Sequence, residues 1–251
     1  MKKRIGLVVA SVAVLAVGTQ AAIIAQDDFS YADGALTGQS GGSGFSDAWS
    51  TAFGTGNHIE SGVAQSQGTG GNIRTLNSEW GSSGTVWFTF DFGTSVDQNT
   101  FAGLSFFADT NGDVGRTERV LIGDRSGADV WGIAFPSGGF SNSSLSTEGY
   151  KTGVGRITLG ASATSSIDLW VGANAVDAVD ISGASDATLT GLQLEDVTQV
   201  RFAAGADTYS YDNFILGDTY TDVGAIPEPA TLGLLGVFGG GLLFIRRRFM
   251  N

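Results

Sequence analysis

The chain has 251 residues, 39 glycines, no cysteine and a formal net charge of −12 at pH 7. The absence of cysteine excludes disulfides, thiol catalysis and cysteine-based metal sites. An acidic surface repels the phosphates of nucleic acids, so we expect no nucleic-acid partner and favour neutral glycans, cations or other proteins.

Residues 1–21 have the pattern of a secretory signal peptide. Basic residues at 2–4 precede an apolar run over 5–17, and small residues follow that run. A basic start, an apolar segment of this length and small residues at the cut are typical of such signals. We therefore expect the chain to be exported, with cleavage after Ala21 or Ala22.

Residues 22–226 form the predicted exported domain. In this segment 7 basic residues stand against 24 acidic ones, which gives a net charge of −17. Its length suffices for one core and is common for a single all-β domain. The many glycines indicate frequent turns, and we expect no helix longer than a turn or two.

Alternating apolar and polar residues predict β-strands in this domain. Segment 85–92 alternates strictly, with one face formed by Val86, Phe88, Phe90 and Phe92 and the other by Thr85, Trp87, Thr89 and Asp91. Further strands are predicted at 104–108, 119–123, 130–135, 155–159, 167–171, 197–203 and 209–216. Short strands separated by turn clusters predict a sandwich or barrel.

The two ends of the domain carry a resemblance to a known family. Segment 28–45, DFSYADGALTGQSGGSGF, followed by Trp49, resembles the opening of bacterial surface domains of the concanavalin A-like, laminin G-like superfamily. Segment 211–223, YDNFILGDTYTDV, is similar to their closing strand, while Phe45 stands where the pattern more often has tryptophan. The resemblance implies an all-β jelly-roll β-sandwich whose first and last strands lie side by side, which protects an edge of the sheet.

The residues that catalysis would need are missing or badly spaced. Residues 38–42 read GQSGG, the string of a serine nucleophile elbow, but no helix pattern follows. The one histidine, His58, comes 18 residues after Ser40, excludes histidine-based zinc sites and is expected in an exposed loop. No glutamate is followed at the second position by aspartate, as in the glucanases of this fold. We therefore predict that the chain is not an enzyme, with a glycoside hydrolase as the least favoured alternative.

Oxygen ligands repeat at alternate positions in one turn. Asp109, Asn111 and Asp113 have the spacing of a calcium loop, although Val114 follows where such a loop needs glycine. A solvated hairpin explains the same residues. Calcium, bound there or near Asp27 and Asp28, is therefore the one cofactor that the sequence suggests.

Tryptophan is the residue type that could bind sugars, because its face stacks on pyranose rings. The tryptophans are at 49, 80, 87, 131 and 170, and most of these large rings are expected in the core. Trp80 stands in the most loop-like sequence and is the predicted surface platform.

Residues 227–251 form the predicted C-terminal sorting segment. It consists of Pro227, Glu228 and Pro229, an uncharged run over 230–245, and Arg246, Arg247 and Arg248. The run is slightly shorter than the roughly 20 residues that usually span a bilayer, and we expect a single transmembrane helix with its arginines in the cytoplasm. A buried C-terminal helix is the alternative, but no polar face is present to meet water.

This segment resembles the PEP-CTERM sorting signal of Gram-negative bacteria that make extracellular polymer. The resemblance implies an exosortase as membrane partner, anchoring in the inner membrane, and transfer to the cell envelope or the extracellular matrix. The favoured hypothesis is a structural or adhesive surface protein. The alternative is a lectin-like module for a neutral extracellular polysaccharide.

Overall fold

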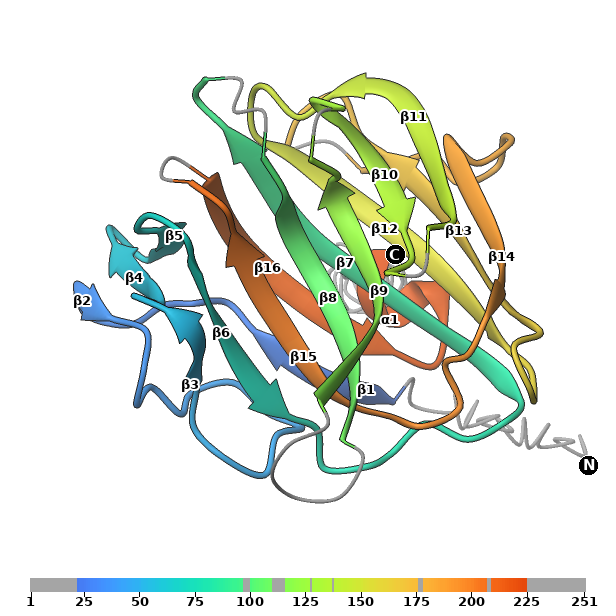
Figure 1. The fold of residues 1–251 in the computed structure, drawn as a ribbon, viewed down its shortest axis with the longest axis horizontal. Helices are drawn as coiled ribbons and strands as arrows, with labels where there is room; N and C mark the ends of the chain where they lie inside the picture. The colour runs from blue at the N-terminus through green and yellow to red at the C-terminus, as the bar shows by residue number, and fades with distance from the viewer. Residues whose placement is uncertain are drawn as a thin grey trace, which may run out of the picture.

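The structure, a computed structural model, describes residues 22–96, 100–109, 116–126, 128–136, 138–175, 178–206 and 209–224. Within these ranges the chain forms two antiparallel β-sheets and one short helix, α1 (Tyr220–Gly224). The strands of the two sheets overlap in Figure 1, as in a β-sandwich. The prediction of an all-β sandwich is confirmed.

The larger sheet has nine strands in the order β14-β13-β12-β7-β16-β5-β4-β2, and β1 also pairs with β16. Their bounds are β1 (Ile23–Asp27), β2 (Gly34–Ala35), β4 (Asn57–Glu60), β5 (Val63–Ser66), β7 (Gly84–Thr94), β12 (Lys151–Leu159), β13 (Ser165–Val171), β14 (Ala187–Leu192) and β16 (Tyr209–Gly217). The first and last strands thus lie side by side, as predicted.

The smaller sheet has seven strands in the order β11-β10-β9-β8-β15-β6-β3. Their bounds are β3 (Ser50–Gly54), β6 (Gly70–Thr75), β8 (Ala102–Asp109), β9 (Arg116–Asp124), β10 (Val130–Ala134), β11 (Phe140–Ser146) and β15 (Val197–Ala204). Every strand predicted from alternation is present in one of the two sheets. The strands between residues 23 and 75, together with β11 and β14, were not predicted from alternation. Those before residue 76 are short, and most are polar or glycine-rich.

Aromatic rings from both sheets fill the space between them. The predicted inner face of β7, Val86, Phe88, Phe90 and Phe92, is buried. Phe90 lies 5.4 Å from Trp131 of β10 and 6.0 Å from Phe202 of β15, measured between ring centroids. The 37–46 stretch is an ordered loop, and Trp49 after it is buried against Phe29. With no disulfide available, this packing supplies most of the stabilisation.

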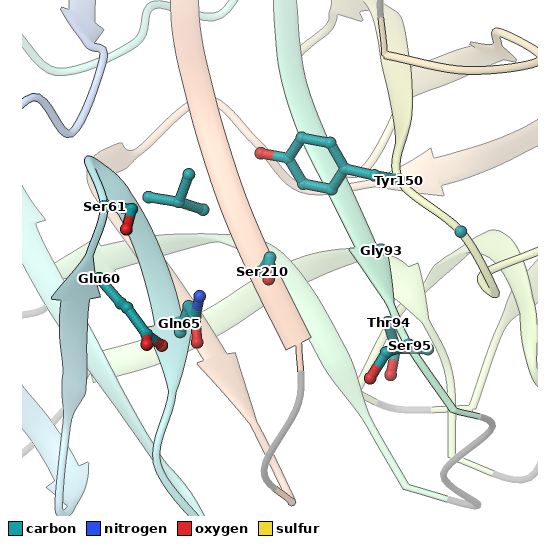
Figure 2. A pocket seen from close by; sticks show the side chains of 10 residues that line it. Glu60, Ser61, Gln65, Gly93, Thr94, Ser95, Tyr150 and Ser210 are labelled. Atoms are coloured by element: carbon teal, nitrogen blue, oxygen red, sulfur yellow. The ribbon is translucent and has the colours of Figure 1, made fainter.

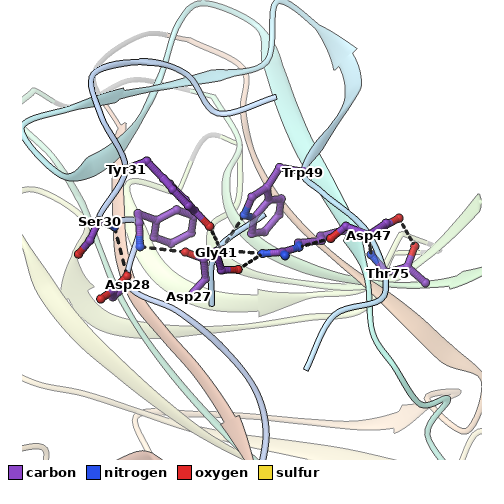
Figure 3. Close-up of polar contacts among 10 residues, drawn as sticks. Asp27, Asp28, Ser30, Tyr31, Gly41, Asp47, Trp49 and Thr75 are labelled. Carbon is purple, nitrogen blue, oxygen red and sulfur yellow. Dashed lines mark hydrogen bonds and ion pairs between the residues drawn. The ribbon is translucent and has the colours of Figure 1, made fainter. Parts of the chain in front are cut away.

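A buried ion pair joins β1 of the larger sheet to β6 of the smaller sheet (Figure 3). Arg74 of β6 donates from Nη1 to Oδ2 of Asp27 in β1 over 2.9 Å, and both side chains are almost wholly buried. The same carboxylate oxygen accepts the Tyr31 hydroxyl at 2.6 Å and Trp49 Nε1 at 2.8 Å. Asp27 Oδ1 accepts the amide of Phe29 at 2.9 Å. Each acceptor of this buried carboxylate therefore has a donor, which offsets the cost of removing it from water.

Arg74 is held equally well on its other side. Its Nε donates to the carbonyl of Asp47 over 2.7 Å, and its Nη1 also reaches the carbonyl of Gly41 over 2.8 Å. The guanidinium lies 4.2 Å from the centroid of the Phe45 ring, within cation–π distance. The ion pair thereby fixes the glycine-rich loop as well as β1.

Replacing Asp27 by asparagine tests how much this network contributes to the stability of the fold. Asp27→Asn keeps the shape but leaves Arg74 buried without a counter-charge, so we expect the free energy of unfolding to fall by about 3 kcal/mol. Denaturant unfolding of the full-length protein measures it. The control is Asp28→Asn at the exposed neighbouring carboxylate, where Asn can still accept the Ser30 amide. Equal stability of the two variants would show that the pair contributes little.

Candidate functional site

Trp80 does not lie on the surface, and this part of the sequence prediction is wrong. Its side chain is 5% exposed and belongs to the main hydrophobic core. Its ring centroid is 4.8 Å from that of Phe106 in β8. The amide of Trp80 donates to the carbonyl of Val197, which draws the loop-like sequence inward. The ring therefore offers no free face to a sugar.

The carboxylate of Asp27 is not available to calcium, because Arg74 neutralises it and protein donors occupy both oxygens. Asn111, Asp113 and the side chain of Asp109 lie outside the described residues. Among the residues that the structure describes, no group of three histidine, cysteine, aspartate or glutamate side chains could hold a metal ion. A calcium site at the 109–113 turn stays a prediction.

The predicted signal peptide, residues 1–21, and the sorting segment with Pro227, Glu228, Pro229, Arg246, Arg247 and Arg248 also lie outside the described residues. Within the described ranges, no helix has the length and apolar character needed to cross a membrane. Export and anchoring therefore stay predictions.

An open groove of about 580 Å³ lies on the outer face of the larger sheet (Figure 2). It is lined by Glu60, Ser61, Val63, Gln65, Gly93, Thr94, Ser95, Gly149, Tyr150 and Ser210. In Figure 2 the β4–β5 hairpin forms one side, Ser210 of β16 lies in the middle, and the end of β7 with Tyr150 forms the other side. Four segments far apart in the sequence therefore meet here.

A tight turn shapes the hairpin side of the groove. Glu60 pairs with Val63 across the turn, and the two residues between them, Ser61 and Gly62, have φ angles of 54° and 77°. Two positive φ values in a two-residue loop are the mark of a type I′ hairpin, whose twist matches that of its strands. Asp33 Oδ1 accepts a hydrogen bond from the Ser61 amide over 2.8 Å, which holds the turn in place.

The opposite side depends on a glycine. A Cβ atom at Gly93 would lie 2.0 Å from the carbonyl oxygen of Gly149, so only glycine lets the turn before β12 approach β7 this closely. Thr94 and Gly149 then exchange a hydrogen bond of 3.0 Å between the Gly149 amide and the Thr94 carbonyl. This contact places Tyr150 over the sheet. Its hydroxyl points across β16 toward the β4–β5 hairpin (Figure 2).

The Tyr150 hydroxyl is buried and, within the described structure, has no hydrogen-bond partner. Burial raises the pKa of this phenol, and the nearby charges of Asp212 and Asp91 raise it further. Tyr150 therefore stays protonated at neutral pH. It contributes an aromatic ring to the wall of the groove.

Two carboxylates face each other next to the groove. Asp212 of β16 and Asp91 of β7 are direct cross-strand partners. They lie two residues along their strands from Ser210 and Gly93, which line the groove. Like charges in this arrangement destabilise a sheet. The charge on Asp91 is stabilised by hydrogen bonds that its carboxylate accepts from the hydroxyl of Thr152 and, over 2.8 Å, from Asn213 Nδ2.

A β-bulge begins directly after this pair. The pairing of β16 with β7 shifts register between Asp212 and Ile215, and Asn213 has a φ of 49°. Along its other edge, β16 pairs with β5 only at Ser210 and Tyr211 and with β1 only from Phe214 onward. Asp212 and Asn213 therefore sit where one neighbouring strand has ended and the other has not begun. Bulges of this kind are common beside functional sites.

Burial and like charge control the ionisation of the pair. Burial is the main cause that raises the pKa of Asp212 to about 6, with the charges of Asp91, Asp28 and Asp27 adding to it. Burial also raises the pKa of Asp91, against the hydrogen bonds from Thr152 and Asn213. At neutral pH a fraction of Asp212 therefore keeps its proton and can donate it.

His58 is not an exposed loop residue as predicted, because the strand at 57–60 was not recognised in the sequence. It lies on β4, opposite Gln65 of β5, with its side chain 27% exposed. Its Nε2 is 3.8 Å from Oε2 of Glu60, whose own side chain is 61% exposed. Its Nδ1 is buried and, in the described part of the chain, has no partner.

The groove combines an aromatic ring with hydroxyl, amide and carboxylate groups. Such a set can stack on a sugar ring while hydrogen bonds fix the sugar hydroxyls. Sequence reasoning put Asp91 on the face of its strand opposite Phe90 and Phe92, which is correct, but it missed Tyr150 and Asp212. The one available signal was the polar alternation of Ser210 and Asp212 within an apolar strand. Tyr150 precedes its strand and gives no periodic signal.

No protein-family model and no curated protein matches the chain. Among solved structures it is similar to an endo-β-1,4-glucuronan lyase from the fungus Trichoderma reesei, with a TM-score of 0.47 and 14% identity, covering 76% of this chain and 95% of that one. A mutant of the alginate lyase Aly36B with an alginate tetrasaccharide gives a TM-score of 0.42 and 13% identity, covering 78% and 96%. A Trypanosoma rangeli sialidase with sialic acid gives 0.43 and 12%, covering 74% of this chain and 30% of the sialidase.

The prediction that the chain is not an enzyme is contradicted by these matches, because they include two lyases and a sialidase. The matches give no support to a structural or adhesive role. A likeness of this degree assigns neither a substrate nor a reaction to this chain, so the function is argued from the groove itself.

The Asp91–Asp212 pair predicts a pH-dependent stability. The Asp212 carboxyl titrates near 6 when folded and near 3.8 when unfolded, so the folded state binds more protons between these values and stability falls as the pH rises. In Asp212→Asn this fall should be smaller, with a gain of about 1 kcal/mol at pH 7.5 and little change at pH 4. Asp124, whose pKa burial also raises to about 6, leaves a residual slope.

Denaturant unfolding at pH 4 and pH 7.5 measures this difference. The control is Asp218→Asn, which removes an exposed carboxylate directly after the same strand. A gain for Asp212→Asn that is the same at both pH values would contradict the account of the pair.

Proposed function

We propose that the protein is an exported carbohydrate-binding domain, with the groove on the nine-stranded sheet as its binding site. The observation that carries this proposal is the lining of the groove. An aromatic side chain, Tyr150, stands beside hydroxyl and amide groups from three other segments, in an open groove of about 580 Å³. A sugar chain needs this combination of an apolar ring face and several hydrogen-bonding groups.

An open groove suits a chain better than a single small molecule. A pocket for a small ligand encloses most of the ligand surface and is mainly apolar. Here the lining residues stand on the surface of a sheet, and Glu60, Ser61 and Ser95 are exposed. A polysaccharide segment lying across β5, β16 and β7 fits this shape.

Delivery to the cell surface belongs to the same proposal. The signal-peptide pattern at residues 1–21 and the PEP-CTERM-like segment at 227–251 support export, handling by an exosortase and release to the envelope or matrix. The motifs at 28–45 and 211–223 support a concanavalin A-like jelly roll. A carbohydrate-binding domain sorted in this way would meet extracellular polysaccharide.

Cleavage of the bound glycan is the second candidate function. The Asp212 carboxyl beside Asp91 favours it, because glycoside hydrolysis needs a carboxyl group that donates a proton to the leaving oxygen. Asp212 is half-buried with a pKa of about 6, which suits a proton donor. Asp91 is 5% exposed and would act by holding Asp212 in its protonated form.

A glycan array followed by calorimetric titration of the best oligosaccharide tests binding. Tyr150→Ala removes the ring and should weaken binding about tenfold, while Tyr150→Phe keeps the ring and should lose less. Phe140→Ala is the control, because it removes another exposed aromatic ring from β11 of the other sheet. Assay of new reducing ends in the same incubations tests cleavage.

A blank array would refute carbohydrate binding. So would equal affinities for Tyr150→Ala and Phe140→Ala on a glycan that does bind. Thermal unfolding of each variant shows whether a loss of affinity comes from the groove or from the fold.

A further inference from the structure

We propose that Asp124, buried inside the sandwich, positions two parts of the groove and makes their position depend on pH. Asp124 is the last residue of β9 in the seven-stranded sheet and is not one of the described residues that line the groove. Its effect on the shape of the groove does not depend on what the groove binds. Its effect on affinity rests on the proposed carbohydrate function.

The Asp124 carboxylate joins two segments that form the groove. Its Oδ2 accepts a hydrogen bond from the hydroxyl of Tyr209 over 3.0 Å and another from the hydroxyl of Thr147 over 3.2 Å. Tyr209 is the first residue of β16, and Thr147 begins the turn that leads to Tyr150 and β12. One oxygen atom therefore holds both the strand in the middle of the groove and the turn in its wall.

Both hydroxyl donors lie directly beside residues that line the groove. Tyr209 precedes Ser210 and is the cross-strand partner of Thr94. The carbonyl of Thr147 accepts the Thr94 amide over 3.1 Å, and the Gly149 amide donates to the Thr94 carbonyl over 3.0 Å. A shift of either donor therefore moves the lining of the groove.

The Asp124 carboxylate has no counter-charge. Asp124 is 0% exposed, and none of the ion pairs within the described ranges includes it. Its cross-strand neighbours, Ala102 of β8 and Trp131 of β10, are uncharged. The guanidinium of Arg125, the next residue, lies over the ring of Phe140, 3.8 Å from its centroid. A buried carboxylate without a cation is costly, which favours its neutral form.

The other titratable groups around this carboxyl do not supply the missing positive charge. Tyr211 of β16 is a neutral phenol, because burial raises its pKa. On the neighbouring turn, the ammonium of Lys151 donates to the carbonyls of Ser146 and Glu148. Asp129 adds a negative charge. Proton uptake is therefore the way in which this site can become neutral.

Ionisation of Asp124 falls within the physiological pH range. Burial is the main cause that raises its pKa to about 6, and the charge of Asp129 adds to it, against the hydrogen bonds from Tyr209 and Thr147. Below this pH the carboxyl is neutral and suits a site without water. Above it, the carboxylate can regain hydration only if a segment that covers it moves.

The turn at 147–149 is the segment that we expect to move. Thr147 is buried, but Glu148 and Gly149 after it are exposed. Surface turns of this kind open locally at a lower cost in free energy than strands in the middle of a sheet. The turn should therefore be closed at low pH and should loosen as the pH rises through about 6.

A pH titration of the full-length protein followed by amide chemical shifts tests the inference. We expect the amides of Thr147, Gly149 and Ser210 to titrate with one midpoint near 6. Protection of the Gly149 amide against hydrogen exchange, corrected for the intrinsic rate, should fall about tenfold between pH 5 and pH 7.5.

Asp124→Asn keeps an oxygen that can accept both hydroxyls but cannot ionise. It should abolish the titration of the Thr147 and Gly149 amides and keep the protection high at both pH values. The control is Asp212→Asn, which removes the other carboxyl beside the groove with a pKa of about 6. In that variant the two amides should still titrate. Loss of their titration in Asp212→Asn and not in Asp124→Asn, or no titration in the unaltered protein, would overturn the inference.

Tyr209→Phe gives a second test that does not depend on the folding of Asp124→Asn. It removes one hydrogen bond that favours the charged carboxylate, so the midpoint at Thr147 and Gly149 should rise by about 1 pH unit. An unchanged midpoint would contradict the role of Asp124.

The affinity for the oligosaccharide that binds most tightly on the array measures the consequence for the groove. It should fall about threefold between pH 5 and pH 7.5, and less in Asp124→Asn. Equal falls in the two proteins would refute the coupling to binding. If no glycan binds at all, the proposed function fails, while the amide titrations still decide whether Asp124 controls the turn.

Discussion

The buried ion pair between Asp27 and Arg74 is the contact on which the arrangement of this domain depends. A chain without cysteine has no covalent means to hold its N-terminal segment, and the pair does so with charge and hydrogen bonds. Burying two charges is costly unless every polar atom finds a partner, and here the hydroxyl of Tyr31, the indole of Trp49 and two backbone carbonyls complete the set. The pair joins β1 of one sheet to β6 of the other.

The position of β1 along β16 affects the sheet beside the groove. Because β1 occupies only the C-terminal part of the edge of β16 and β5 occupies the N-terminal part, Asp212 and Asn213 are left between the two strands. The alternation of β16 places the half-buried Asp212 carboxylate on the outer face beside Asp91, and the bulge begins directly after it. Two facing acids are unfavourable for the stability of a sheet, and this is the reason for placing the proposed binding site on this face.

Much of the fold could be predicted from the sequence, because strict alternation in long segments such as 85–92 indicates both where a strand lies and which of its faces is buried. The pairing of the first and last strands was implied by the resemblance of segments 28–45 and 211–223 to the two ends of a known superfamily. The groove could not be predicted, since it depends on long-range register: Tyr150 acquires its place from the contact of Gly149 with Gly93. The prediction for Trp80 was wrong because its loop-like sequence suggested exposure. In the structure a backbone hydrogen bond to Val197 and packing against Phe106 hold the ring in the core.

Carbohydrate binding is proposed for the outer face of the nine-stranded sheet and for neither face of the seven-stranded sheet. Amide chemical-shift mapping of the full-length protein, titrated with the oligosaccharide that binds most tightly, distinguishes the two sheets. Binding in the groove should perturb mainly the amides of residues 60–65, 93–95, 149–150 and 210–213. Perturbations centred on β9, β10 and β11, or spread evenly over the surface, would contradict it.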